Sequence, residues 1–290
     1  MTNDHISFIG FGEAAGAFLS GWALVDPARV AAFDIKSEQS GAADMMRARY
    51  AQTGVRGCAS PAEAVAGTAM VFSVVTADQA LFAAKAAAPH LPKGVFWFDC
   101  NSCAPATKRR AAEVIEAAGG RYVDVAVMAP VYPKRHHVPL NIAGPHAEAA
   151  AEVLRSLDMK PTVTGPEVGH ASSIKMIRSV MIKGLEALVA ECFLSARRAG
   201  VEEQVLASLE ASDPDIAWRK RGAYNLERMM VHGARRASEL REVAITVEDL
   251  GLPGLMSAAT AEWQDKIAAL KADPGGDDLT ARLDAILTRL

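Results

Sequence analysis

The chain has 290 residues, a length that favours two domains when a domain averages roughly 150 residues. Half of the residues are hydrophobic and 22% are charged, which is typical of an ordinary globular protein. With 31 basic and 34 acidic residues the net charge is −3, so the chain offers no overall field for capturing DNA or anionic lipid. Neither nucleic acid nor a membrane is therefore expected as the main partner.

Cysteine content and apolar runs exclude further classes. Four cysteines are too few for a disulfide framework in a chain of this length. The first five residues, MTNDH, lack the basic region and the apolar stretch of a signal peptide. The longest apolar runs have the length of a strand and not of a membrane span. These features predict a cytoplasmic protein.

The first 165 residues alternate β-rich segments with alanine-rich helical ones. Predicted strands cover 5–10, 30–34, 54–58, 70–75, 95–99, 122–127 and 140–143. Predicted helices cover 13–24, 38–52, 78–88 and 106–118, and the third of these is expected to begin at Asp78 as its N-cap. Strands that alternate with helices of this length predict an α/β, doubly wound parallel sheet of the Rossmann type over residues 1–165.

The pattern changes near Gly165. Residues 171–199 form one uninterrupted helical pattern that ends at Gly200, a typical C-terminal glycine. Further helices are predicted over 202–212, from Pro214 onward, and over 234–250, 255–270 and 279–290. Residues 166–290 are therefore predicted to form an all-α domain that opens with a long helix.

A glycine-rich segment follows the first predicted strand and opens the first predicted helix. Its sequence fits G-x-G-x-x-A, a variant of the dinucleotide-binding fingerprint. Gly10 would permit the tight turn and Gly12 the close approach of a pyrophosphate, which the free N–H groups at the helix N-terminus would bind. The segment predicts a cofactor site formed by Gly10, Phe11, Gly12, Glu13 and Ala14. A plain tight turn is the alternative interpretation.

The second predicted strand ends at Asp34, 22 residues beyond Gly12. A carboxylate at this place accepts hydrogen bonds from the ribose hydroxyls and repels a 2′-phosphate, which favours NAD over NADP. Lys36 argues in the other direction. A solvated carboxylate at a strand end is the alternative for Asp34.

Four segments together resemble the β-hydroxyacid dehydrogenase family, which includes 3-hydroxyisobutyrate and 6-phosphogluconate dehydrogenases. The first is the glycine segment, and the second is 98–102 followed by Pro105, which resembles D-x-S/N-S/T…P. The third is 169–175, which resembles G-x-G-x-x-x-K, and the fourth is 240–244, which resembles K-D-L-x-L-A with Arg241 in place of lysine. The resemblance implies an oxidoreductase in which Ser102 lies against the nicotinamide. It also implies cofactor contacts from Val75, Thr76 and Arg241.

The same resemblance points to Lys175 as the catalytic residue. Oxidation of a hydroxyl by hydride transfer needs a base, and reduction of a carbonyl needs an acid. In a closed cleft beside the cationic nicotinamide the ammonium form is disfavoured, which moves the pKa of a lysine toward working pH. The alternative is that Lys175 is one solvated charge on a long helix.

The residues expected to contact the substrate depart from the family pattern. Ser179 stands where the family usually carries asparagine, and Met128-Ala129-Pro130 replaces its serine and two glycines. Proline has no N–H, so Pro130 cannot bind a substrate carboxylate through its backbone as the family's glycine does. Substrate contacts are predicted at Met128, Ala129, Arg178 and Ser179, with a small anionic hydroxyacid as substrate. Arg178 or the run 134–137 is a candidate anion anchor, and the run equally suits a solvated loop.

Other clusters are assigned no chemistry. Cys100 and Cys103 form a single CxxC, and the pair His136-His137 lacks a third ligand at recognisable spacing, so no metal is expected. The basic residues of 218–236 suit a charged helical surface balanced by Glu227, Glu239 and Glu242, or a set of arginines that closes over the nicotinamide or an acidic substrate.

The long helix and the last amphipathic helix suit a homodimer interface. Two other functions stay open at this point. One is an imine reductase of the same fold, although those enzymes usually replace the lysine with Asp or Tyr. The other is a dinucleotide-binding regulatory protein without catalysis.

Overall fold

The structure, a computed structural model, describes residues 5–23 and 25–290. The chain divides into two compact units, Met1–Met176 and Ile177–Leu290, each with its own hydrophobic core. The division falls inside one helix, α7 (His170–Ala199), and not at the composition change before it. Leu24, the predicted end of the first helix, lies outside the described residues, as do the first four residues.

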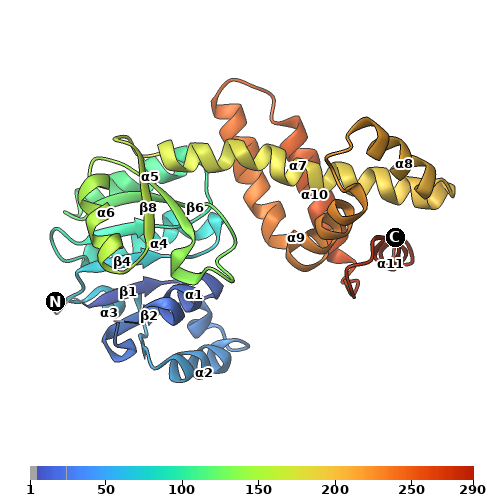
Figure 1. Ribbon diagram of the computed structural model, residues 1–290. Helices are drawn as coiled ribbons and strands as arrows, with labels where there is room; N and C mark the ends of the chain where they lie inside the picture. The colour runs from blue at the N-terminus through green and yellow to red at the C-terminus, as the bar shows by residue number, and fades with distance from the viewer. Residues whose placement is uncertain (1–4, 24) are drawn as a thin grey trace. The chain divides into compact units, whose positions relative to one another are not determined.

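Within the described residues, the first unit contains an eight-stranded sheet in the order β3-β2-β1-β4-β5-β6-β7-β8 (Figure 1). The strands are β1 (Ile6–Ile9), β2 (Val30–Phe33), β3 (Arg56–Gly57), β4 (Met70–Ser73), β5 (Phe96–Asp99), β6 (Arg121–Val127), β7 (Pro139–Ala143) and β8 (Lys160–Gly165). All neighbouring strands are parallel except β6 and β7, which pair antiparallel. The predicted Rossmann-like α/β sheet is thus confirmed.

The sheet is buried on both faces. In β5, Phe96 and Phe98 belong to one hydrophobic cluster and Trp97 to the other, because successive side chains of a strand point to opposite faces. The covering helices are α1 (Glu13–Gly21), α2 (Ala43–Thr53), α3 (Pro61–Val65), α4 (Ala80–Ala87), α5 (Pro105–Ala117) and α6 (Ala147–Ser156). Such double coverage explains why the strands read as continuous apolar runs.

Three helix boundaries were predicted wrongly. Helix α1 ends at Gly21. Residues Ile35–Glu38 form a 3₁₀ turn, and α2 begins only at Ala43. Asp78 is not a helix N-cap: it lies in another 3₁₀ turn, Ala77–Gln79, and its carboxylate accepts a hydrogen bond from the Gln79 side chain.

Three elements were not predicted. Helix α3 is only five residues long, and α6 and β8 lie in the last part of the unit. β8 is an edge strand without a continuous buried face, so its hydrophobic alternation is weak.

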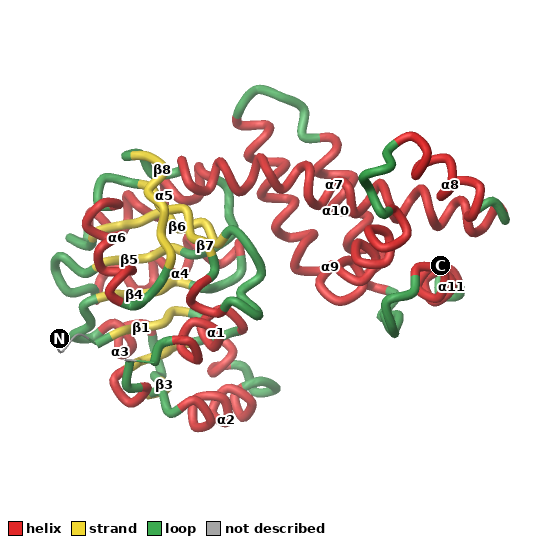
Figure 2. Tube along the Cα trace, in the orientation of Figure 1, coloured by secondary structure: helices red, strands yellow, loops and turns green. Residues whose placement is uncertain are grey.

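The second unit is helical (Figure 2). It contains the larger part of α7, followed by α8 (Glu202–Ser212), α9 (Trp218–Asp249), α10 (Leu255–Ala269) and α11 (Leu279–Leu287). Helix α9 is continuous where the sequence predicted separate segments. Gly233 lies within it because a Cβ there would approach the Gln264 carbonyl oxygen of α10 to 2.6 Å. In the part of the chain described, no helix combines the length and the apolar character needed to cross a membrane.

Candidate functional site

The carboxyl ends of β1, β4, β5 and β6 lie at one edge of the sheet, because these strands are parallel. The strand order reverses between β1 and β4, and ligands of open α/β sheets bind at such a switch point. The loops that follow these four strands carry predicted site residues: Gly10–Gly12, Val75–Thr76, Ser102 and Met128–Ala129. The fold therefore brings the loops of the predicted site to the same edge.

The two glycines of the first loop have different roles. Gly10 has φ +88°, and a Cβ there would lie 2.7 Å from the Val74 carbonyl oxygen, so only glycine fits. A Cβ on Gly12 would meet nothing within 4 Å. Gly12 is the N-cap of α1 and its helix start has no side-chain cap, so open space adjoins the first-turn N–H groups. These features fit a pyrophosphate.

The backbone of Phe11, between the two glycines, is held at both polar groups. Its N–H donates to Asp34 Oδ2 at 2.8 Å, and its carbonyl oxygen accepts a hydrogen bond from Arg49 Nη1 at 3.0 Å. Asp34 Oδ1 accepts a second backbone hydrogen bond, from Lys36 N at 3.0 Å. Asp34 is thereby fixed at the end of β2, and each of its oxygens retains a further lone pair for a ligand.

Asn101 joins the loops after β4 and β5. Its Oδ1 accepts a hydrogen bond from the Val75 N–H at 2.7 Å, and its Nδ2 donates to Ser73 Oγ at 2.9 Å and to Asp99 Oδ1 at 2.7 Å. The residue that follows it is Ser102, so Asn101 fixes the place of that side chain. Sequence reasoning did not assign Asn101 a role, although a polar residue directly after a buried strand was the available signal.

A charged group that was not predicted from the sequence lies against β5 and β6. Lys108 on α5 is fully buried, with Nζ 3.0 Å from Asp99 Oδ1 and 3.4 Å from Asp124 Oδ1. Tyr122 donates to the other oxygen of Asp99 at 2.7 Å. Burial by itself lowers the pKa of Lys108, but the two carboxylates outweigh it and raise that pKa above its ordinary value. The signal was a lysine within the apolar stripe of α5.

Asp124 also holds the start of α7. Its Oδ2 accepts hydrogen bonds from Gly169 N at 3.1 Å, Ser172 N at 3.0 Å and Ser172 Oγ at 3.1 Å. A carboxylate at a helix N-terminus satisfies N–H groups that have no partner within the helix. The first turns of α7 are thus tied to β6.

Lys175 lies in the second turn of α7, and its Nζ donates to Ser102 Oγ at 2.6 Å. The two residues are separated by 73 positions in the chain, and the sequence had assigned them to one site. Lys175 is half-buried and belongs to the first unit. An ammonium group is therefore held beside the loop after β5.

The neighbouring thiols are buried. Burial raises the pKa of Cys100 to about 12, and Cys103 is completely inaccessible. A thiol in this state is a poor nucleophile and a poor metal ligand at neutral pH.

The substrate-loop residues lie after β6. The Met128 N–H donates to the Pro139 carbonyl oxygen at 2.9 Å, and Pro130 has no N–H to offer. Arg178 and Ser179 belong to the second unit, where Arg178 is exposed and Ser179 is buried.

The basic groups proposed as anion anchors are partly engaged. In the run 134–137, Arg135 Nη1 donates to the Ser20 carbonyl oxygen at 3.4 Å, and His137 Nε2 lies 2.7 Å from Asp158 Oδ2. In the second unit, carboxylates pair with Arg219, Arg236 and Arg241. The pairs are Arg219–Glu203, Arg236–Glu186 and Arg241–Asp265.

The partners of these arginines differ from those named from the sequence. Glu203, Glu186 and Asp265 lie on α8, α7 and α10, whereas Glu239 pairs with Lys183 at 2.6 Å. The cluster 218–236 is thus in part internal to the helical unit.

Comparison with known proteins agrees with this geometry. Residues 5–158 match the family described as the NAD binding domain of 6-phosphogluconate dehydrogenase, and residues 196–267 match a domain of unknown function. A conserved hypothetical protein from Sinorhizobium meliloti is 40% identical, with a TM-score of 0.76 over 100% of this chain and 97% of that one.

More distant structures share the fold. A conserved protein described as similar to 3-hydroxyacid dehydrogenases is 30% identical over 92% of this chain and 98% of its own, with a TM-score of 0.68. A 3-hydroxyisobutyrate dehydrogenase from Mycobacterium tuberculosis, solved with L-serine, is 18% identical, with a TM-score of 0.72 over 98% and 99% of the two chains. An imine reductase from Myxococcus stipitatus in complex with NADP⁺ is 18% identical over 98% and 99%, with a TM-score of 0.54.

The matched region covers the glycine loop, Asp34 and the loops after β4, β5 and β6, which are the parts that fit a dinucleotide. The chain belongs to the family of the NAD-binding domain of 6-phosphogluconate dehydrogenase, and its fold is that of 3-hydroxyisobutyrate dehydrogenase-like proteins with a helical C-terminal domain.

Proposed function

We propose that this protein is an NAD-dependent oxidoreductase that interconverts the hydroxyl and carbonyl groups of a small anionic hydroxyacid, with Lys175 as general acid and base. The observation that carries the proposal is the hydrogen bond from Lys175 Nζ to Ser102 Oγ, 2.6 Å long. It holds an amine beside the loop that follows β5, at the edge where a dinucleotide-binding domain receives its cofactor.

The cofactor would supply the hydride acceptor or donor. Gly10, Phe11, Gly12, Glu13 and Ala14 would hold the pyrophosphate, and Val75, Thr76 and Ser102 the nicotinamide end. Lys175 takes the hydroxyl proton during oxidation and returns a proton to the carbonyl oxygen during reduction. Ser102 accepts a hydrogen bond from the ammonium, so it orients the proton carrier. In the second unit, Arg178 and Ser179 are the proposed substrate contacts from α7.

At the loop after β6, side chains and not backbone N–H groups are proposed to contact the substrate. Met128 already donates its N–H to Pro139, and Pro130 has none. Met128 and Ala129 therefore shape the site, while the anionic group of the substrate is assigned to Arg178.

The preference for NAD rests on Asp34. Its two backbone hydrogen bonds, of 2.8 and 3.0 Å, hold its charge at the end of β2. A fixed carboxylate accepts from ribose hydroxyls and repels a phosphate in the same place. Direct titration with NAD and NADP tests this: an equal or tighter dissociation constant for NADP would overturn it. Arg241 is also a proposed cofactor contact, and its guanidinium pairs with Asp265. We expect its replacement to weaken NAD binding, and unchanged binding would overturn this contact.

The central experiment assays the purified protein on a panel of 3-hydroxyacids, and of imines for comparison, with NAD and NADP. We expect turnover of a hydroxyacid, and a loss of kcat of about 10² to 10⁴ in Lys175→Ala with NAD affinity retained. Lys93→Ala, a change of an exposed lysine outside the site, serves as control. Full activity in Lys175→Ala would contradict the mechanism. Turnover of imines alone would favour a reductase, and NAD binding without turnover would favour a regulatory role.

We further propose a homodimer formed through α7. Ile177, Met181 and Leu188 are 49, 65 and 54% exposed, and their spacing places them within about 40° on one helix face. An apolar helix face of this kind is typical of a subunit interface. Helix α11, by contrast, buries Leu283 and Ile286 in the core of its own unit, so its apolar side is not offered to a partner.

A further inference from the structure

Outside the dinucleotide site, three potential metal ligands converge. His136 and His137 lie in a 3₁₀ turn, Arg135–His137, on the connection from β6 to β7. Asp158 lies in the turn between α6 and β8. One ligand atom from each residue lies within 4.8 Å of the other two. In the sequence the histidine pair has no third ligand at recognisable spacing, but the fold supplies one from 21 residues further along the chain.

We propose that His136 Nε2, His137 Nε2 and Asp158 Oδ2 bind one zinc ion. Two imidazoles and a carboxylate form a donor set that zinc prefers. Donors about 2.1 Å from a tetrahedral ion are about 3.4 Å apart. His136 Nε2 and Asp158 Oδ2 are separated by 3.6 Å, which is too long for a hydrogen bond but close to this value. His137 Nε2, at 2.7 Å from the same oxygen, needs to move away by about 0.7 Å.

Packing leaves His136 one nitrogen for a ligand. The residue is buried, and its Nδ1 edge faces Gly21 at the end of α1, where a Cβ would collide with the ring. Nδ1 is also a buried atom with no hydrogen-bond partner among the described residues. Nε2 therefore points away from α1, to the side of Asp158. The rings of His136 and His137 lie 3.9 Å apart between centroids, so both present their Nε2 atoms in one region.

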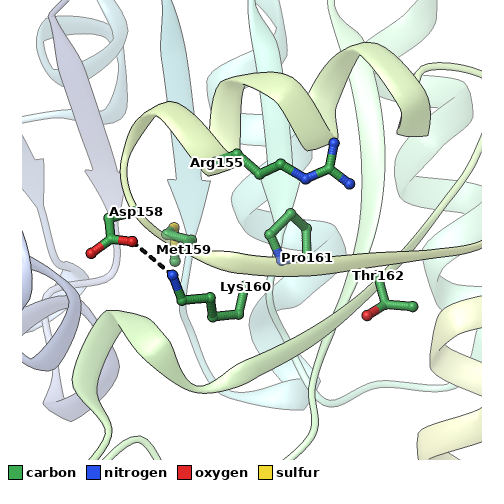
Figure 3. Close-up of a pocket in the computed structure, with 6 residues that line it drawn as sticks. All are labelled: Arg155, Asp158, Met159, Lys160, Pro161 and Thr162. Atoms are coloured by element: carbon green, nitrogen blue, oxygen red, sulfur yellow. Dashed lines mark hydrogen bonds and ion pairs between the residues drawn. The ribbon is translucent and has the colours of Figure 1, made fainter.

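The carboxylate is held for one-oxygen binding. Lys160 Nζ contacts Asp158 Oδ1 at 2.7 Å, which leaves Oδ2 to the histidines. Asp158 and Lys160 both line a pocket of about 340 Å³. Figure 3 shows the contact between them. A partner that orients a ligating carboxylate in this way is a common second layer of a metal site. Because His137 and Asp158 are largely exposed, water has access to complete the coordination.

The ion would have a structural effect. It would fasten the β6–β7 connection, which carries Met128 and Ala129 at its start, to the α6–β8 turn. These two segments lead into β7 and β8, whose first residues, Pro139 and Lys160, are paired, so the ion would link the chain at the starts of two neighbouring strands. This inference does not depend on the proposed reaction, because no cofactor or substrate residue is among the ligands.

The test uses the full-length chain freed of metal with a chelator. Equilibrium dialysis against ZnCl₂ gives the stoichiometry and affinity, and cobalt substitution gives a visible spectrum that reports the geometry. His137→Ala and Asp158→Asn remove one ligand each. Asn is chosen because Asp158 has φ +54°, a conformation that asparagine also tolerates. His146→Ala is the matched control, since His146 pairs with Glu116 at 3.1 Å without a second histidine.

We expect one zinc per chain, a rise in the midpoint of thermal unfolding on zinc addition, and a loss of affinity of at least about tenfold in each ligand variant. His146→Ala should bind zinc as the unchanged protein does. The proposal would be overturned if the unchanged protein binds less than one zinc per chain. It would also be overturned if Asp158→Asn and His137→Ala bind zinc as tightly as the unchanged protein does. Thermal unfolding of each variant in chelator shows whether it folds, so a folding defect cannot be mistaken for a lost ligand.

Discussion

At the scale of single residues, the two glycines of the first loop separate folding from binding. Gly10 has a left-handed backbone conformation, and a side chain there would collide with the Val74 carbonyl oxygen. Any other residue at this position would therefore strain the fold. At Gly12 the space that a Cβ would enter is empty of protein. Gly10 is thus required by the fold, whereas Gly12 leaves space for a ligand.

Replacement of each glycine by alanine should therefore give different results. Gly10→Ala is expected to lower the free energy of unfolding by about 2 kcal/mol or more, because it adds backbone strain and a close contact. Gly12→Ala should leave the free energy of unfolding within about 1 kcal/mol but weaken NAD binding, because its methyl occupies the pyrophosphate space. Urea unfolding and NAD titration of both variants measure the difference. Equal stability of the two variants would contradict the role given to Gly10.

Lys108 allows a second prediction at this scale. Its ammonium lies between the buried carboxylates of Asp99 and Asp124. Lys108→Met leaves two negative charges uncompensated, and removal of one partner of a buried ion pair costs about 3–5 kcal/mol. Urea unfolding at neutral pH should show a loss of that size. A change of the exposed Lys93 to Met is the control, and a loss below about 1 kcal/mol in Lys108→Met would contradict the account.

At the scale of elements, the start of α7 connects the sheet to Lys175, the proposed acid and base. Asp124 at the centre of β6 accepts three hydrogen bonds from Gly169 and Ser172, and Lys175 follows in the next turn. Asp124→Asn keeps the size of the side chain but loses its charge. We expect a lower kcat, by about tenfold, with little change in the affinity for NAD, since a misplaced helix start moves Lys175 and not the glycine loop. An unchanged kcat would show that the cap does not position the lysine.

Helix α7 also carries a pH-dependent group. Burial lowers the pKa of Lys183 below its ordinary value of 10.5, against the effect of Glu239. Between these two pKa values the unfolded chain binds more protons than the folded one, so the free energy of unfolding rises with pH in that window. Lys183→Met should lose this part of the slope, while Lys266→Met, a change of an exposed lysine on α10, should keep it. Urea unfolding at several pH values below 10.5 measures both, and an equal slope in the two variants would contradict the prediction.

The sequence predicted elements with strong periodicity and missed those that depend on partners. The parallel strands and the span of α7 follow from apolar runs and from the glycine that ends the helix. The turn of Ile35–Glu38 does not, because it begins with a hydrogen bond from Lys36 N to the Asp34 side chain, a local contact that leaves no apolar pattern. Likewise, a separate helix was predicted over 234–250, whereas α9 continues through Gly233, where α10 comes close.

The candidate site was predictable where a residue type and a spacing identify a chemical role. Lys175 and Ser102 were assigned to one site from the family resemblance, which did not predict the hydrogen bond between them. Asn101 and Lys108 were missed, because their roles are defined by backbone and carboxylate partners that only the folded sheet brings together. The same holds for Asp158, whose approach to the two histidines depends on the pairing of β7 with β8.

At the scale of the whole molecule, the exposed apolar face of α7 predicts the oligomeric state. Met181→Glu places a charge at the centre of this face and should convert a dimer to a monomer without unfolding it, because the residue is 65% exposed. Light scattering after size exclusion measures the mass. Leu283→Glu on α11 should instead unfold the second unit, since Leu283 is completely buried. A dimer that persists in Met181→Glu would place the interface elsewhere.

The hydrogen bonds of Asp124 have a consequence for synthesis on the ribosome. The first turn is the slow step in forming a helix, and each later residue adds at little cost. β6 precedes α7 in the chain, so the carboxylate that caps α7 leaves the ribosome before the N–H groups that donate to it. The residue at which α7 begins is thus tied to a strand that is made earlier.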